Sequence, residues 1–279
     1  NRLLNDMTMM KRLFIPFSVV LLLASGCNKD TCNEPLAFNY DPNGTSAENC
    51  IWQPLNVRIQ FNPMFGEEEM KLDQDFQTSD GRTISFHYYG MYLTEISLLT
   101  DEEYIRLGND SGSCMDRRSD VFLLLDSNRT YENITLPAGN ISAIRFNVGM
   151  DTCRNNNLDP TTVAHGPLAP QFPTMYWAWA TGYRFVSLSG FVDNSLNGDG
   201  SSETAFEYHT GLNALLSSVE LKDPEFTQSG TELFLEVNVD LGELLNDLDF
   251  TTDLITHTGN NLPLAEKITH NVQNAFSLE

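Results

Sequence analysis

The chain is poor in positive charge. Only 16 Lys and Arg residues stand against 38 Asp and Glu, which gives a net charge of −22. Phosphate backbones bind basic surfaces, so this shortage excludes nucleic acid as the expected partner. The 279 residues are nevertheless 41% hydrophobic and 10% aromatic, which is the composition of a folded protein rather than a disordered one.

The short motifs of common enzymes are also absent. The sequence contains no G-x-S-x-G, Walker loop, G-x-G-x-x-G or H-E-x-x-H. No C-x-x-C occurs, which argues against a thiol redox motif or a zinc ribbon. No pair of its many acidic residues stands out as the carboxylate pair of a glycosidase, and most such residues form a solvated surface. We therefore predict that the protein is not an enzyme.

Residues 1–26 consist of a few upstream residues followed by a segment with the pattern of an export signal. A basic pair precedes the apolar run Leu13 to Leu23, and small residues then lead to Cys27. The run is too short to span a membrane comfortably. The ending Ala-Ser-Gly-Cys resembles the bacterial lipobox, in which the cysteine is lipidated; ordinary signal cleavage with Cys27 as a structural thiol is the alternative. We expect a protein of the bacterial cell envelope that meets the membrane only through this anchor.

Without Cys27, the five cysteines leave an even number for disulfides. Exported proteins fold where thiols are oxidised, so we expect these four to pair. Four cysteines allow three connectivities, and the sequence does not choose among them. A bond between the first two would close a short loop-rich segment, and a bond between the last two would join two loops. The four are Cys32, Cys50, Cys114 and Cys153.

Residues 27–53 differ in composition from the rest of the chain. Asn, Asp, Pro and Gly dominate the segment, and these residues form turns rather than a core. The segment resembles a short Cys…Ala-x-Asn-Tyr-Asp-Pro…Cys module of cell-surface proteins in Bacteroidetes. We predict a disulfide-stapled spacer between the lipid anchor and the following domain. Asp41 and Asn43 offer oxygen ligands for calcium, but Asp-Pro-Asn-Gly is foremost a turn sequence.

From residue 55 onward, apolar and polar residues alternate, which is the pattern of half-buried strands. Turn-rich segments separate these stretches. Many short strands of this kind predict a mainly β protein, an antiparallel β-sandwich over residues 55–279. Leu264, Ile268, Val272 and Phe276 recur every four residues after Pro263 and predict a C-terminal helix. Besides the strand from Leu55, strands are expected at Thr83–Leu99, Val121–Leu125, Ile141–Val148, Tyr183–Leu188 and Leu233–Val239, and a second short helix at Asp240–Leu248.

The loop Asp193–Thr204 has oxygen side chains at alternating positions and a glycine sixth, as calcium loops do. Its twelfth position is Thr204 rather than Glu, and its flanks have the pattern of strands. We therefore favour an ordinary polar hairpin loop over a calcium site.

Two sets of side chains are candidates for a site. None of the five histidines is spaced for a local metal motif, so a metal site would have to be assembled by the fold. His209 and His257 each lie between an apolar stretch and a glycine, where ligands from different elements can converge. Trp177 and Trp179 stand two residues apart and would share one face of a strand, which is also compatible with a core aromatic cluster. His165 and His270 are expected to have no such role.

Four stretches resemble the MbnP-like copper-binding proteins, a family named for the methanobactin operon. The resemblance implies a β-sandwich of the cell envelope that captures, stores or delivers copper through histidine imidazoles. It also implies that a partner di-haem peroxidase of the MbnH type oxidises one tryptophan to kynurenine. The stretches are Val57–Gly66, Phe86–Leu98, Leu136–Asp151 and Met175–Gly190, and the tail Leu264–Phe276 resembles Bacteroidetes members.

Carried over to this sequence, the resemblance implies a set of ligands and a modified residue. Imidazole suits copper in either oxidation state, and a thioether favours the reduced ion. The implied ligands are His209, then His257, then His87. The residues implied beside them are Trp179, preferred for oxidation, then Trp177, with Met175 as the thioether.

Two functions of other classes also fit the sequence. A surface interaction or adhesion module could keep the fold without the metal, since fold does not settle function. A carbohydrate-binding accessory protein could stack Trp177 and Trp179 on sugar rings. Exposed tryptophans would favour the sugar hypothesis, whereas tryptophans buried beside His209 would favour copper.

Overall fold

The structure is a computed structural model, and contacts divide it into two compact units, Asn1–Ile51 and Trp52–Glu279. Cys27 and the predicted export signal lie outside the described residues. The structure describes residues 31–35, 37–100, 103–108, 112–116, 118–136, 141–177, 182–195, 203–222, 228–229 and 231–279.

The first unit is a loop structure held by a disulfide between Cys32 and Cys50, one of the pairings that the sequence leaves open. Among its described residues only Cys32 and Ala37 are buried, so no apolar core supports it. Backbone hydrogen bonds instead gather around Cys32, whose carbonyl accepts from Asp41 N at 2.9 Å. The Asp41 carboxylate accepts from Asn43 N at 2.9 Å, which is the turn chemistry expected there.

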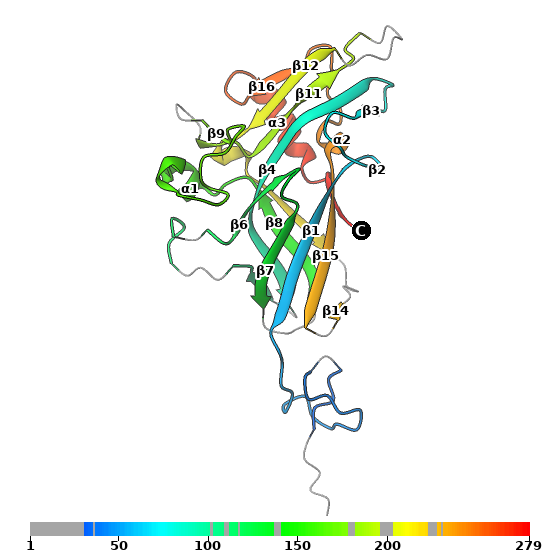
Figure 1. Cartoon of the computed structure of the whole chain (residues 1–279), viewed down its shortest axis with the longest axis vertical. Coiled ribbons are helices and arrows are strands. Elements are labelled where there is room, and N and C mark those ends of the chain that lie inside the picture. Colours follow the sequence, from blue (N-terminus) through cyan, green and yellow to red (C-terminus); the bar gives the residue numbers. More distant parts are fainter. Residues whose placement is uncertain are drawn as a thin grey trace, which may run out of the picture. The chain divides into compact units, whose positions relative to one another are not determined.

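The second unit consists mainly of strands, as predicted, in two main sheets (Figure 1). The smaller sheet has the order β14 (Gln228–Ser229), β15 (Glu232–Asp240), β1 (Leu55–Phe65), β2 (Glu68–Glu69), with β17 (Phe276–Leu278) also paired to β15 and β7 (Thr130–Leu136) to β1. The larger has the order β13 (Ser217–Lys222), β8 (Ile141–Val148), β4 (Thr83–Thr100), β11 (Val186–Val192), β12 (Thr204–Thr210), β16 (Ile255–His257), with β3 (Asp75–Gln77), β5 (Glu103–Arg106) and β6 (Val121–Leu125) also paired to β4. A short ribbon pairs β9 (Tyr176–Trp177) with β10 (Gly182–Tyr183).

The core lies between the two sheets. Alternate residues of β1 point inward, and Phe61 stacks on Phe122 of β6 at 5.5 Å between ring centroids. The same ring meets Phe146 of β8 edge-on at 6.0 Å. Buried aromatic pairs of this kind join the inner faces of both sheets, which confirms the predicted sandwich.

Among the described strands, two pairs depart from the antiparallel pattern that the sequence predicts. β1 pairs with β15, and β12 pairs with β16, in parallel. Parallel neighbours need a long crossover between them, and the alternation within one strand carries no trace of it. Local patterning therefore predicted β1, β15 and the strand-like flank that becomes β12, but neither β16 nor the direction of these two pairs.

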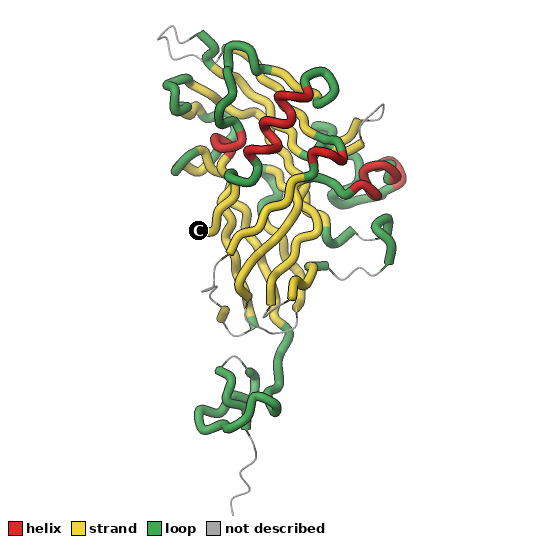
Figure 2. The backbone as a smooth tube through the Cα atoms, turned by 180° about the vertical axis from the view of Figure 1, so that it is seen from behind, coloured by secondary structure: helices red, strands yellow, loops and turns green. Residues whose placement is uncertain are grey.

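The predicted C-terminal helix is present as α3 (Leu262–Asn271) (Figure 2). The Asn261 side chain caps it by accepting from Leu264 N. Leu264 and Ile268 of the predicted stripe are buried on it, whereas Phe276 belongs to β17. The second predicted helix is shorter than expected, at α2 (Leu241–Leu244). No helix among the described residues has the length and apolar character to cross a membrane. The remaining helical turns are α1 (Thr152–Asn157), η1 (Pro160–Thr162) and η2 (Asn213–Leu215).

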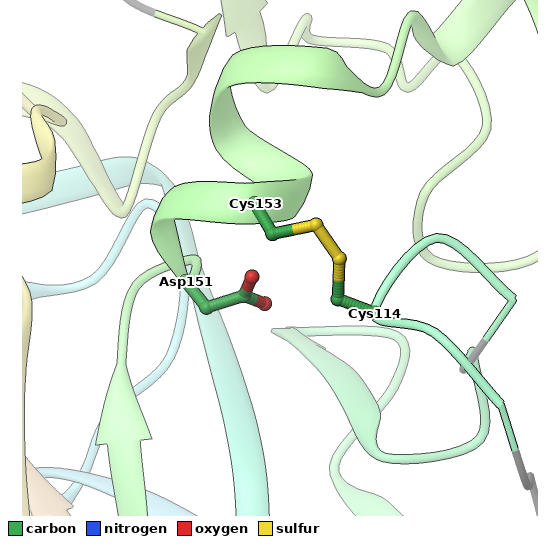
Figure 3. A group of neighbouring side chains, drawn as sticks. All are labelled: Cys114, Asp151 and Cys153. Carbon is green, nitrogen blue, oxygen red and sulfur yellow. A yellow bond between two sulfur atoms is a disulfide. The ribbon is translucent and has the colours of Figure 1, made fainter.

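A second disulfide joins Cys114 to Cys153 on α1 and completes the cysteine pairing (Figure 3). Asp151 lies beside it and caps α1 by accepting from Arg154 N at 3.1 Å. The fully buried Arg154 side chain also donates to Asp120 at 2.6 Å and to the Asp151 carboxylate. Because a buried guanidinium is costly unless it is paired, these bonds fix α1 firmly to its surroundings.

The disulfide of the first unit generates a prediction. A loop of 18 residues closed by a disulfide is stabilised by about 3 kcal/mol in the chain-entropy model, and here few buried side chains can replace it. Replacing Cys32 and Cys50 by Ser should make residues 31–51 sensitive to limited proteolysis and leave the thermal unfolding of residues 52–279 unchanged. A Cys32/Cys50 variant in which residues 31–51 resist proteolysis as well as in wild type would contradict this. The matched control, Cys114→Ser with Cys153→Ser, removes the other disulfide and should leave residues 31–51 resistant.

Candidate metal centre

The first part of the centre lies on β12, whose successive side chains alternate between the two faces of the larger sheet. Phe206 and Tyr208 point into the sandwich core and are buried there. Successive strand residues point to opposite faces, so Glu207 and His209 lie together on the outer face of the larger sheet. His209 is nevertheless only 3% exposed, because other segments cover it.

His257 reaches the same place through the parallel pairing of β16 with β12, which sets His257 opposite His209. The two Nδ1 atoms lie 2.9 Å apart, and the ring centroids lie 4.9 Å apart. The turn after β16 holds this register, since Thr258 Oγ1 donates to the backbone oxygen of His209 at 2.9 Å. The backbone N–H of His257 donates to Asn260 Oδ1 at 2.6 Å.

Glu207 is the third member of this group. Its Oε1 lies 3.2 Å from His209 Nε2, and its Oε2 lies 3.9 Å from His257 Nε2. One ligand atom from each of these three residues lies within 4.8 Å of the others, a spacing that can hold a metal ion. Glu207 was not among the predicted site residues, although its position two residues before His209 in a strand places it on the same face.

Trp177 and Arg184 cover His209. The buried Trp177 ring lies 6.1 Å from that of His209 at an angle of 64°, and the Arg184 guanidinium carbon lies 5.3 Å from the Trp177 ring centroid. Arg184 Nη1 lies 3.2 Å from His209 Nε2. Close approach requires Gly211, where a Cβ would lie 2.9 Å from Trp177 Cζ3. Arg184 was not a predicted site residue, since nothing in the local sequence sets it apart.

Burial controls the charge of these side chains. Burial first, and then the Arg184 guanidinium and His257, lower the pKa of His209 to about 3. Burial likewise lowers the pKa of Arg184. His209 is therefore neutral at physiological pH and can offer a nitrogen lone pair to a metal ion, as imidazole ligands must.

Of the other predicted residues, Met175 and His87 lie outside the group of Glu207, His209 and His257. Met175 is buried against Gly90 of β4, where an added Cβ would lie 3.1 Å from Met175 Sδ. Gly90 pairs with Ser187 of β11, and Ser187 pairs with His209 of β12, so Gly90 is two strands away from His209 in the larger sheet. His87 is exposed on β4, paired with Asp73 and edge-on to Phe191 at 4.8 Å between ring centroids. His87 is thus not part of the group around His209. Trp179 lies outside the described residues, and His165 and His270 are exposed.

Two further groups contain residue types that can bind ions. The loop Asp193–Thr204 joins β11 to β12 as a hairpin, and the Asp193 side chain accepts from Ser195 N at 2.9 Å; residues 196–202 lie outside the described part. Cys114 and Cys153 lie beside Asp151, but their sulfurs are joined in a disulfide (Figure 3). Thiolates that would bind a metal ion are therefore not available there.

The lowered pKa of His209 predicts a pH-dependent stability. The unfolded imidazole titrates near 6.5 and the folded one at about 3, so the unfolded state binds more protons between these values. The stability that this group contributes is complete above the unfolded pKa and is lost as the pH falls toward 3, at up to about 1.4 kcal/mol per pH unit. His209→Gln should remove this dependence.

Urea unfolding of the metal-free protein at about pH 7 and about pH 4 checks it. The free energy of unfolding should differ more between wild type and variant at the higher pH. An equal difference at both pH values would contradict the buried, neutral imidazole. His270→Gln, on an exposed histidine, is the control.

Comparison with known proteins places the chain in a family. The family model described as MbnP matches residues 54–262, which include the larger sheet and every residue of the centre. No curated protein matches the chain. A solved structure, MbnP from Methylosinus trichosporium, is 17% identical; the alignment covers 74% of this chain and 82% of that chain, with a TM-score of 0.48. The extent of the family match shows that the chain belongs to the MbnP family.

Proposed function

We propose that this protein binds copper through His209 and His257, for capture, storage or delivery rather than catalysis. The observation that carries the proposal is the approach to 2.9 Å of two imidazole nitrogens from neighbouring strands that are far apart in sequence. Ligand nitrogens at about 2.0 Å from one ion lie about 2.8 Å apart in adjacent positions of a tetragonal Cu(II) site and about 3.3 Å apart in a tetrahedral Cu(I) site, so the pair fits the first directly and the second after a shift of a few tenths of an ångström. Imidazole suits copper, and the paired cysteines leave no competing thiolate among Cys32, Cys50, Cys114 and Cys153.

The wider setting agrees with copper binding in the cell envelope. A net charge of −22 concentrates cations near the surface. A lipid on Cys27 would keep the protein at the membrane, with the stapled unit as a spacer. Family membership supports the same function for the domain that carries the two histidines.

Trp177 distinguishes this proposal from its rivals. A sugar-stacking tryptophan must be exposed, but Trp177 is 3% exposed and lies against His209. Its burial therefore favours copper over carbohydrate. An interaction or adhesion module without metal is the function that remains if no copper binds.

Copper titration tests the proposal. With Cu(I) supplied under reducing conditions, the wild-type protein should bind about one ion per chain, because one pair of imidazoles faces one position. His209→Ala and His257→Ala should each weaken binding, and the double variant should abolish it. His165→Ala is the matched control, and His87→Ala should bind like wild type because His87 lies outside the group. Equal copper in wild type and double variant would overturn the proposal.

We further propose that a tryptophan beside the centre is oxidised to kynurenine by a partner di-haem peroxidase of the MbnH type. Trp177 is the described tryptophan in position for this, with its ring edge-on to His209. Trp179, preferred from the sequence, remains the alternative.

Mass spectrometry on protein from its native host checks this modification. A peptide that contains both tryptophans should carry the mass of one kynurenine, and its fragments should assign it to Trp177 or Trp179. Trp52, in the exposed segment before β1, should stay unmodified and serves as the internal control. Unmodified Trp177 and Trp179 would contradict the oxidation and leave copper binding as a separate claim.

A further inference from the structure

The environment of His209 contains a conflict of hydrogen bonds. Its Nε2 lies 3.2 Å from Arg184 Nη1 and 3.2 Å from Glu207 Oε1. A guanidinium only donates hydrogen bonds, whereas a carboxylate accepts them. A neutral imidazole has one protonated nitrogen, so Nε2 can satisfy Arg184 or Glu207 but not both at once. Each partner therefore favours a different tautomer of the same ring.

The two tautomers differ at the nitrogen that faces His257. When Nε2 accepts from Arg184, the proton is on Nδ1, and Nδ1–H donates to His257 Nδ1 across 2.9 Å. When Nε2–H donates to Glu207, the Nδ1 lone pair is free and faces His257. Only the second tautomer offers Nδ1 as a metal ligand.

The same 2.9 Å contact decides which nitrogens can bind one ion. If both rings bound through Nε2, both Nδ1 atoms would carry hydrogen and two donors would face each other. If both rings bind through Nδ1, both Nε2–H groups face the carboxylate of Glu207, at 3.2 Å and 3.9 Å. One carboxylate would then hold both ligand rings, as outer partners of metal-bound histidines commonly do.

We propose that Glu207 and Arg184 are opposed positioning residues that set the tautomer of His209: Arg184 holds the empty site with Nδ1 protonated, and Glu207 holds both rings for binding through Nδ1. This inference rests on the proposed copper function and adds the ligand atoms and the residues that present them. His209 stays neutral throughout. One proton leaves Nδ1 to solvent and one is gained at Nε2 from solvent, so no net proton is released by this ring.

Arg184 does not bind the metal ion in this scheme. Its guanidinium gives up His209 Nε2 on loading and keeps the face of the Trp177 ring at 5.3 Å. Arg184 therefore opposes loading, because its hydrogen bond stabilises the empty tautomer. Glu207 favours loading for the converse reason.

Nitrogen NMR of the histidine rings tests the tautomers directly. In the metal-free protein, His209 should be protonated at Nδ1; with diamagnetic Cu(I), His209 and His257 should both be protonated at Nε2. Arg184→Leu should shift the metal-free ring toward the Nε2–H tautomer, which needs no copper to be seen. Bound copper with Nδ1 still protonated on either ring would overturn the inference while leaving the proposed function intact.

Copper affinity gives the second measurement. Glu207→Leu should weaken Cu(I) binding about 10- to 100-fold, the usual effect of losing an outer partner of a ligand histidine. Glu207→Gln keeps an acceptor oxygen and should be weakened less, whereas Arg184→Leu should bind at least as tightly as wild type. Glu232→Gln makes the same charge change on β15 and should have no effect.

The outcomes distinguish the positioning roles of Glu207 and Arg184 from copper binding itself. Wild-type affinity in Glu207→Leu, or loss of copper in Arg184→Leu comparable to that of His209→Ala, overturns the positioning roles but not copper binding. Failure of the wild-type protein to bind copper overturns both. Glu207 is about half exposed and Glu207→Gln is isosteric, so a folded variant is expected and thermal unfolding confirms it.

Discussion

The centre depends on the parallel register between β12 and β16. This pairing brings together two histidines that are 48 residues apart in the sequence, and a shift by one residue would turn one ring to the other face of the sheet. The register is held directly after His257. Thr258 adopts a positive φ of 62°, unusual for a β-branched residue, and its hydroxyl bonds to the backbone of His209. Immediately afterwards α3 packs on both strands (Figure 2).

Burial gives this pair its chemical character. An imidazole on the outer face of a sheet would ordinarily be solvated and would titrate near neutrality. Trp177 and Arg184 remove water from His209, and the low dielectric together with the guanidinium charge keeps the ring neutral. Protons therefore do not compete for its lone pair over the physiological range. His257, more exposed, leaves one side of the pair open to an arriving ion.

The sequence predicted the parts better than their arrangement. Alternation in β1 and β8 located those strands, since each has one buried face. The direction of the two parallel strand pairs could not be predicted, because a crossover leaves no local pattern in the sequence. The apolar stripe of α3 ran one turn too far and included Phe276 of β17, since buried positions in a following strand can continue a four-residue spacing by chance.

For the site, too, some residues could be predicted from the sequence whereas their contacts could not. His209 and His257 could be chosen because each ends an element before a glycine, whereas His87 resembled them in type but the fold pairs it with Asp73. Glu207 could have been predicted, because strand alternation places it on the same face as His209. Arg184 could not, because it enters the site from the β9–β10 ribbon, whose position is set by contacts far away in sequence.

Those distant contacts connect the stability of the fold to the centre. Asn155 of α1 accepts from Tyr183 N at 2.8 Å, and a Cβ at Gly182 would collide with its side chain, so α1 fixes the strand that leads into Arg184. In turn, α1 is held by the Cys114–Cys153 disulfide and the buried Arg154. A row of tight contacts thus runs from a disulfide to the guanidinium over His209. The residues that cover the centre are thus held by hydrogen bonds and close packing, as a preformed metal site requires.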